Sequence, residues 1–236
     1  MGLFKMPFRD WLERPFSKTH PASATEPQEM ILLTLARAEE NARALTAADL
    51  ANTLNSKPDP HLHALIDQSL VNIDADGKLA LTHAGRERAL ALLRRHRLAE
   101  RFFTDILGFD WARAHEEADK LEHVVSLEAE RQLASQLGEP TTCPHGNPIP
   151  SAHGESALAP SLPLADCPSH VRATIARIAL ETPAALQHLA TLGVLPNVEI
   201  EIENKAPFDG PVLVRVGRAH YALGRDLAAR VWVNPL

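Results

Sequence analysis

Six residues between positions 96 and 123 could together bind metal ions. They are His96, Glu100, His115, Asp119, Glu122 and His123. The first two are four residues apart, and the other four follow one another at spacings of four, three and one. On an α-helix, residues three or four apart lie on one face, so each set would present its side chains together. Imidazole nitrogens and carboxylate oxygens suit divalent transition ions such as Fe(II), Mn(II), Co(II), Ni(II) or Zn(II). The spacing alone leaves open a second interpretation, a solvent-exposed polar helix face.

Apolar residues of the same stretch supply a separate core-facing surface. They are Leu98, Phe102, Phe103, Ile106, Leu107, Leu121, Val124 and Val125. The mixture of histidines and carboxylates is therefore not needed for packing, and it is not what solubility requires. Residues 96–139 also hold ten acidic residues against five basic ones, a balance that suits cations. Metal binding is the hypothesis that these observations favour.

The segment RHRLAERFFTDILGFDWARAHEEADKLEHVVSLEAERQL, followed by CPHGNPIP at 143–150, carries a resemblance to a known family. It resembles the diphtheria-toxin-repressor family of metal-dependent transcriptional regulators, most densely between Leu90 and Pro150. The resemblance implies a homodimer that binds Fe(II) or Mn(II) and then binds double-stranded operator DNA.

The resemblance also implies two metal sites. A primary, activating site would use Met30, Asp119, Glu122 and His123. An ancillary site would use His96, Glu100, His115 and Glu181. Ala184 occupies the position of a further family ligand, a glutamine, so the ancillary site lacks that ligand here.

The choice between manganese and iron stays open. Asp119 lies where iron-responsive members often carry cysteine, and a hard carboxylate favours Mn(II) or Fe(II) over metals that prefer thiolates. Met30 would favour softer metals, because a thioether is a soft ligand. The Cys143 and His145 pair is interpreted as part of a structural loop and not as a metal site.

Composition indicates a soluble, globular chain of two or three small domains. The 236 residues are 45% hydrophobic and 23% charged, with a formal net charge of −6. Two cysteines, Cys143 and Cys167, form neither a disulfide framework nor a paired-cysteine zinc motif. With no signal peptide and no long apolar run, the expected location is the cytoplasm.

The fold predicted from the pattern is α+β and multidomain. Residues 1–28 form an N-terminal extension, and residues 29–95 follow the order of a winged helix-turn-helix: three helices, a hairpin around Asp76-Gly77, and a long helix. Thr46 is a suitable N-cap for the second helix. Residues 96–150 form the metal-binding and dimerisation helices, in which Phe102, Phe103, Phe109 and Trp111 would help to fill a dimer interface.

The expected DNA-reading helix departs from the family pattern. It reads SKPDPHLHALIDQSL, with a Pro-Asp-Pro break and few basic residues. Its candidate DNA-binding groups are Ser56, Lys57, His61, His63 and Gln68. Residues 46–95 hold six basic and six acidic residues, and because phosphate neutralisation supplies most nonspecific affinity, we expect weak nonspecific DNA binding.

The C-terminal part changes to the alternating pattern of β-strands. Residues 151–165 are a Ser/Ala/Pro-rich linker, and residues 166–236 contain about five short strands and one helix that ends at Gly193. This pattern predicts a small barrel. The segment TLGVLPNVEIEIENKAPFDGPVLVRVGRAHYALGRDLAARVWV resembles the ferrous-iron-transport protein A domain, a Src-homology-3-like fold.

Two functions of different classes remain at this point. The first is a metal-dependent DNA-binding regulator that represses metal uptake genes when Mn or Fe is bound. The alternative is a dimeric metal-binding adaptor of a ferrous-iron transporter that has lost operator binding, which the neutral, proline-broken helix would favour. The chain has no nucleophile–base set and no phosphate-binding glycine loop, so we expect no catalysis.

Overall fold

The computed structural model describes residues 26–56, 59–156, 158–180 and 182–236. Residues 1–25 of the expected extension lie outside this range. Two candidate site residues, Lys57 and Glu181, also lie outside the described residues. The predictions for the extension and for Glu181 as an ancillary ligand therefore lie outside the described residues.

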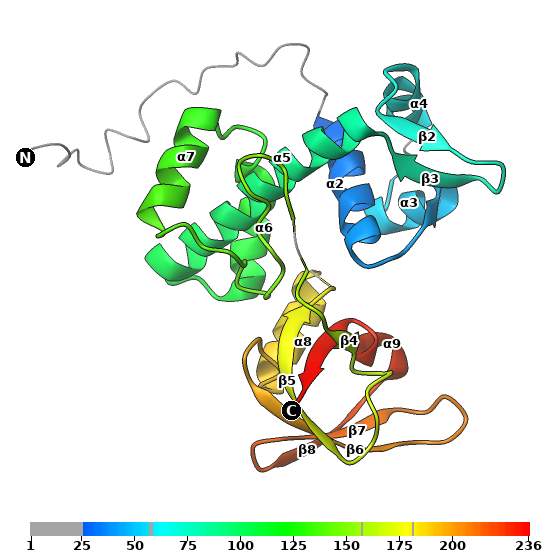
Figure 1. The fold of residues 1–236 in the computed structure, drawn as a ribbon, viewed down its shortest axis with the longest axis vertical. Coiled ribbons are helices and arrows are strands. Elements are labelled where there is room, and N and C mark those ends of the chain that lie inside the picture. Colours follow the sequence, from blue (N-terminus) through cyan, green and yellow to red (C-terminus); the bar gives the residue numbers. More distant parts are fainter. Residues whose placement is uncertain (1–25, 57–58, 157, 181) are drawn as a thin grey trace, which may run out of the picture.

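The N-terminal unit combines helices with a small sheet (Figure 1). Its elements are α2 (Glu26–Glu40), β1 (Leu45–Thr46), α3 (Ala47–Leu54), α4 (Asp59–Asp67), β2 (Val71–Ile73) and β3 (Lys78–Leu81), with strand order β1-β3-β2. The predicted cap is present: the Thr46 hydroxyl accepts from the Asp49 N–H at 3.2 Å, and the Asp49 carboxylate accepts from the Thr46 N–H at 2.9 Å. This reciprocal pair fixes the start of α3. Leu50 and Leu65 are fully buried in the shared core.

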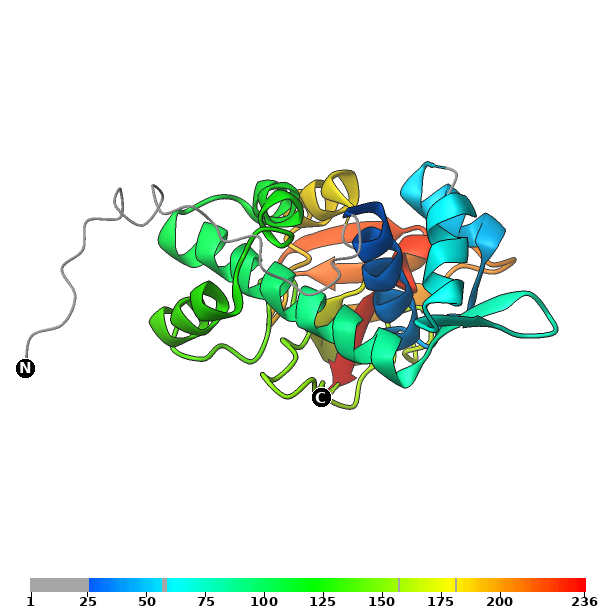
Figure 2. The same cartoon turned by 90° about the horizontal axis from the view of Figure 1, so that it is seen from above.

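A second, helical unit follows without a break. It contains α5 (His83–Arg101), a π-helical segment η1 (Phe102–Ile106), α6 (Trp111–Leu121) and α7 (Leu127–Gln136). Side chains of Thr82, Asp110 and Ser126 cap the three α-helices at their N-termini. Seen from above, α5 runs from the β2–β3 hairpin into the helical unit and lies beside α2 (Figure 2). One helix therefore joins the two units.

The C-terminal unit is a six-stranded antiparallel sheet with two helices. Its elements are β4 (Leu162–Pro163), β5 (Val171–Ile178), α8 (Pro183–Thr191), β6 (Glu199–Lys205), β7 (Val212–Val216), β8 (Ala219–Leu223), α9 (Arg225–Ala228) and β9 (Val231–Pro235). The strand order is β4-β9-β5-β6-β7-β8, so β4 and β8 form the two edges of the sheet among the described residues. Closure into a barrel is not seen. β4 lies within the stretch expected to be a linker, where it pairs with β9.

The loop over residues 143–150 connects the helical unit to the C-terminal sheet. Ile178 N–H donates to the His145 carbonyl at 2.8 Å, and the Asn147 amide donates to the Ile178 carbonyl at 2.8 Å. Gly146 has a φ of +83°, and a Cβ built there would lie 2.2 Å from the Ala176 carbonyl oxygen. Only glycine permits this close backbone approach. Helix α6 also packs against α8 (Figure 1).

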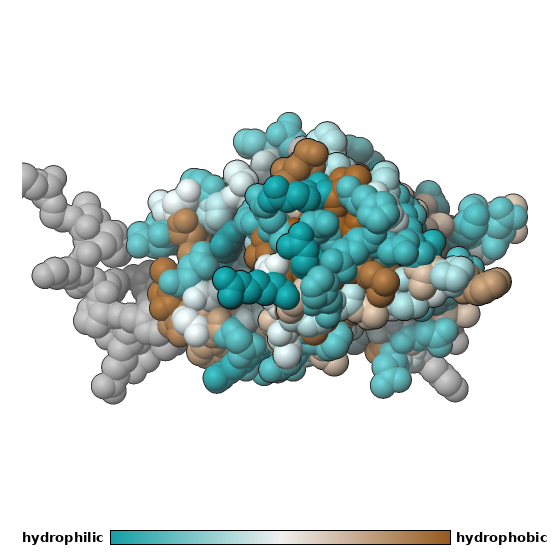
Figure 3. All heavy atoms as spheres, turned by 90° about the horizontal axis from the view of Figure 1, so that it is seen from below, coloured by the Kyte–Doolittle hydropathy of each residue, from teal (hydrophilic) through white to brown (hydrophobic). Residues whose placement is uncertain are grey.

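The face of the molecule seen from below carries mostly hydrophilic side chains with scattered apolar groups (Figure 3). Cross-strand ion pairs between Arg172 and Glu199 and between Arg215 and Glu201 lie on the C-terminal sheet. Among the described helices, none has the length and apolar character needed to cross a bilayer.

Candidate metal centre

Three candidate ligands are buried together between α5 and α6. His96 and Glu100 are one turn apart on α5, and their Nε2 and Oε1 atoms lie 2.9 Å apart. His115, from α6, places its Nδ1 atom 2.7 Å from Glu100 Oε1 and 3.2 Å from His96 Nε2. His96 and Glu100 have no exposed surface, and His115 is 5% exposed. The structure thus brings together the three residues expected for the ancillary site.

His145 joins this cluster from the 143–150 loop. Its Nδ1 atom lies 3.3 Å from Glu100 Oε1, and its side chain is completely buried. The Sγ atom of Cys143 lies 3.7 Å from the same Nδ1 atom. The sequence pattern predicted that both residues belong to a structural loop and not to a metal site. The Cys-x-His spacing was the available signal, but only the fold shows that the loop returns to Glu100.

The candidate residues of the primary site lie on the other side of His96. The Nδ1 atom of His96 is 2.5 Å from Glu122 Oε2 and 3.3 Å from Asp119 Oδ1. His123 Nε2 lies 3.5 Å from Glu122 Oε1. His96 therefore contacts both sets of ligands through its two ring nitrogens, although the sequence assigned it to one set.

Met30 of α2 lines a cavity of about 440 Å³ together with Asp119 and His123 of this second set. Glu29, which was not among the predicted site residues, places its Oε2 atom 2.7 Å from His123 Nδ1. Glu26, Glu29 and Met30 occupy the first turns of α2, so their spacing on one helix face was a usable signal. The first helix of the N-terminal unit thus reaches the end of α6.

Opposite charges determine the electrostatics of the enclosed cluster. Burial works to raise the pKa of Glu100, but the charges of His145 and His96 outweigh burial and hold that pKa well below its usual value. Burial works to lower the pKa of His145, and Glu100 raises it well above its usual value. In the absence of a bound cation, the protonated histidines therefore balance the negative charge of Glu100.

The donor set fits a metal ion. Glu100 Oε2 and His145 Nε2 are buried and have no hydrogen-bond partner within the described part of the chain. Unpaired buried polar atoms cost free energy, so they indicate a missing partner. Donor atoms of Glu100, His115 and His145 lie within 4.8 Å of one another, as do those of His96, His115 and Asp119. Nitrogen and oxygen donors in such groups suit Mn(II), Fe(II) or Zn(II).

The candidate DNA-binding residues lie in and around α4. His63 and Gln68 are exposed and His61 is half-buried, whereas Leu62 and Leu65 face the core. Ser56 is exposed, and Lys57 lies outside the described residues. Helix α4 itself contains no Arg or Lys.

Comparisons with known proteins agree with this architecture. Residues 82–151 match the model of the iron dependent repressor, metal binding and dimerisation domain, and residues 162–235 match the FeoA domain. The iron-dependent repressor IdeR of Mycobacterium tuberculosis is 33% identical over 224 residues, covering 87% of this chain and 96% of that protein. The diphtheria toxin repressor of Corynebacterium efficiens is 49% identical over 81 residues, covering 34% of this chain and 35% of that protein.

Solved structures give the same result. A manganese-dependent transcriptional repressor in complex with manganese superposes with a TM-score of 0.82 at 31% identity, covering 89% of this chain and 100% of that one. IdeR of T. acidophilum gives a TM-score of 0.78 at 30% identity, covering 92% of this chain and 100% of that one. The α+β fold and the buried donor cluster define the class of metal-dependent transcriptional regulators. Within that class, the chain belongs to the iron-dependent repressor family.

Proposed function

We propose that this protein is a homodimeric repressor that binds operator DNA when Fe(II) or Mn(II) is present, and that it silences metal uptake genes. One observation carries the proposal: His96, Glu100 and His115 form a fully enclosed donor cluster in which Glu100 Oε2 has no partner among the described residues. The relatives named above are repressors, which favours this function over a transporter adaptor.

Two groups of residues would hold the ions. His96, Glu100 and His115 would form the ancillary site, with His145 available as a further donor and Glu181 expected from the family pattern. Met30, Asp119, Glu122 and His123 would form the primary site. A bound divalent ion supplies the positive charge that the protonated histidines supply in its absence.

The position of these residues explains how metal could control DNA binding. Met30 and Glu29 belong to α2, the first helix of the N-terminal unit, whereas Glu122 and His123 follow α6. Ligands on both elements would hold α2 at a fixed angle to the helical unit. Metal would therefore favour one orientation of the DNA-binding units, in proportion to its tighter binding to that state.

The N-terminal unit suits the role of a winged helix-turn-helix. Helices α3 and α4 would form the motif, with α4 entering the major groove and the β2–β3 hairpin acting as the wing. Ser56, Lys57, His61, His63 and Gln68 would contact the DNA. Because α4 carries no Arg or Lys, the helix itself would read base edges through its His side chains and would neutralise few phosphates.

The π-helical segment supplies a surface for dimerisation. Ile106 is 58% exposed and Leu107 is 41% exposed, at the end of the helix that carries His96. Large exposed apolar side chains at one place mark contact sites. A two-fold dimer would bury them against the same residues of a second copy and set the distance between the two copies of α4.

The C-terminal unit suits a small Src-homology-3-like domain. Its strand pairing shifts register at two irregularities, between Ile175 and Arg177 and between Ile202 and Asn204. Such bulges increase strand twist and let a short sheet curl around its own core. We place the unit at residues 162–236, after a linker that begins near 151.

The test is fluorescence anisotropy of promoter DNA next to the protein's own gene, with Mn(II), Fe(II) or chelator. We expect binding only with metal, and loss of that binding in Glu122→Gln. Glu117→Gln is the matched control, because among the described residues Glu117 pairs only with Lys120, its exposed neighbour on α6. Metal-independent binding, or an unchanged metal response in Glu122→Gln, would contradict the proposal.

A further inference from the structure

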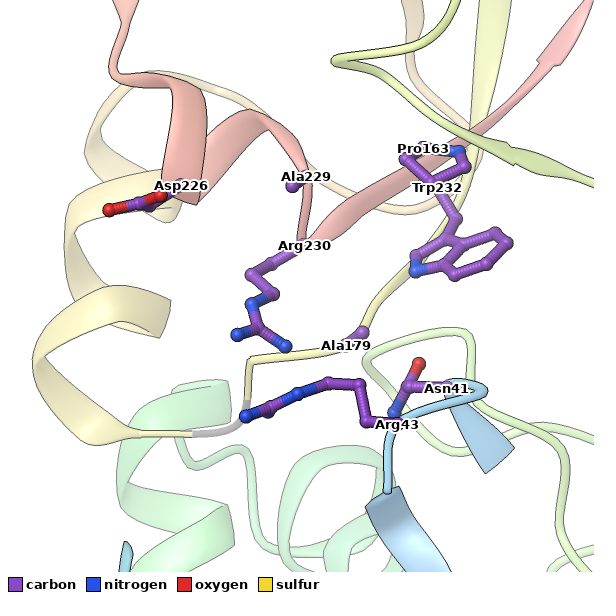
Figure 4. Close-up of a pocket in the computed structure, with 8 residues that line it drawn as sticks. All are labelled: Asn41, Arg43, Pro163, Ala179, Asp226, Ala229, Arg230 and Trp232. Atoms are coloured by element: carbon purple, nitrogen blue, oxygen red, sulfur yellow. The ribbon is translucent and has the colours of Figure 1, made fainter. Parts of the chain in front are cut away.

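A second cavity, separate from the metal centre, lies between the N-terminal unit and the C-terminal sheet (Figure 4). Its volume is about 310 Å³. Asn41 and Arg43 line it from the segment between α2 and β1, and Arg230 and Trp232 line it from the end of α9 and from β9. The cavity therefore lies between the N-terminal unit and the C-terminal sheet, which the candidate metal ligands do not bridge.

Two guanidinium groups face each other across this cavity. In Figure 4 the side chains of Arg43 and Arg230 enter the cavity from opposite walls, and their guanidinium groups point the same way. Within the described residues, no acceptor lies at hydrogen-bond or ion-pair distance from either guanidinium group. Burial lowers the pKa of Arg230, and the positive charge of Arg43 lowers it further. Like charges at close range raise the free energy of the folded state unless a counter-charge lies between them.

The nearby carboxylates offset the two positive charges only in part: the charge of Asp226 raises the pKa of Arg230, but burial and the charge of Arg43 outweigh it. Asp226 lines the cavity, but Figure 4 shows its carboxylate on the outer side of α9, turned away from both guanidinium groups. Asp49 is close enough to Arg43 for its charge to act, yet both the backbone and the hydroxyl of Thr46 already donate to its Oδ2 atom. An external anion would be the missing partner.

Other groups around the cavity add positive potential. The guanidinium carbon of Arg177 lies 4.1 Å from the centre of the Trp232 ring. The indole nitrogen of Trp232 is on the side of the ring that faces the two guanidinium groups (Figure 4). An indole N–H only donates. The guanidinium groups of Arg43 and Arg230 and the indole N–H of Trp232 are all donors, which points to a ligand that accepts hydrogen bonds.

We infer that this cavity binds a small free oxyanion of the phosphate class, held between Arg43 and Arg230. Guanidinium groups match the geometry of tetrahedral oxyanions and bind them through paired, charge-assisted hydrogen bonds. A DNA phosphate is a poor fit, because α4 lies at the far end of the N-terminal unit from α9 (Figure 1). The bound anion would fix the N-terminal unit against the C-terminal sheet. The inference is independent of the metal centre and of the proposed function.

The experiment is a titration of the full, metal-free chain with inorganic phosphate at constant ionic strength, followed by thermal shift and calorimetry. A chelating resin removes metal, so that no anionic chelator competes. We expect saturable binding and a rise in Tm with phosphate. Each of Arg43→Gln and Arg230→Gln should weaken that binding at least about tenfold, the loss of one charge-assisted contact.

The control is Arg218→Gln, a substitution in the turn between β7 and β8, which should leave phosphate binding unchanged. Without phosphate, Arg230→Gln should melt no lower than the parent chain, because the like-charge contact with Arg43 outweighs the attraction of Asp226 and no hydrogen bond is lost. The inference is wrong if phosphate does not bind saturably, or if both substitutions leave binding unchanged. Complete displacement of phosphate by a nonspecific DNA duplex would overturn the assignment to a free anion.

Discussion

The Nδ1 atom of His96 lies 2.5 Å from Glu122 Oε2, while its Nε2 atom lies 2.9 Å from Glu100 Oε1. A single imidazole on α5 therefore contacts both groups of candidate ligands. Because His96 has no exposed surface, a shift of Glu100 should move this ring and so shift Glu122, and the reverse should also hold.

The stability of the metal-free protein should fall as the pH rises. Burial lowers the pKa of His96, but Glu100 and Glu122, against the opposing charge of Arg37, raise the pKa from 6.5 to about 9. A histidine whose folded-state pKa is raised contributes stability below about pH 6.5, and this contribution is lost as the pH rises through about 9. We expect Tm to decrease between these values in scans of the metal-free chain.

The matched variants for this experiment are His96→Gln and His188→Gln. The first should flatten the decrease, whereas the second changes an exposed histidine of α8 and should preserve it. Metal affinity should rise over the same pH range, because the ligands must lose their protons to bind. A Tm that increases with pH in the metal-free chain would contradict the assignment.

Gly146→Ala should uncouple the 143–150 loop from the C-terminal sheet. A Cβ there would lie 2.2 Å from the Ala176 carbonyl oxygen, and φ is +83°. We expect a loss of about 2–4 kcal/mol in the free energy of unfolding, from backbone strain plus the clash. Gly138→Ala is the control: its φ is +74°, but nothing lies within 4 Å, so only the strain of about 1–2 kcal/mol applies. Equal losses in denaturant titrations of the two variants would show that the close contact carries no energy.

His63→Ala should weaken operator binding. Its side chain is exposed on α4, and a specific base contact contributes about 1–3 kcal/mol, which corresponds to about 5- to 150-fold in affinity. Anisotropy titrations at saturating metal measure the change. His188→Ala, an exposed histidine on α8, should bind operator DNA like the parent chain. Unchanged affinity in His63→Ala would remove this residue from the proposed contacts.

Ile106→Asp should convert the dimer to a monomer. The side chain is 58% exposed at the end of η1, and a charge buried in a two-fold interface would face its own copy across the axis. Light scattering after gel filtration gives the mass. Phe208→Asp is the control, because Phe208 is fully exposed in the β6–β7 connection, remote from α5 in the chain. A dimer of unchanged mass in Ile106→Asp would place the interface elsewhere.

The sequence by itself determined the features that depend on neighbouring residues. The four-residue spacing of His96 and Glu100, the Thr46 capping box and the Asp76-Gly77 hairpin all follow from local geometry, which the chain specifies within one or two turns. The family resemblance in the segment 90–150 was carried by the same local motifs, and the family comparisons confirmed it.

Only the tertiary structure decided which distant residues meet. His145 reaches Glu100 because its loop packs on β5, Glu29 reaches His123 because α2 lies against the helical unit, and Arg43 faces Arg230 across two units. Each contact joins residues that are far apart in the chain. Such contacts depend on how whole elements pack, and no local spacing encodes that packing.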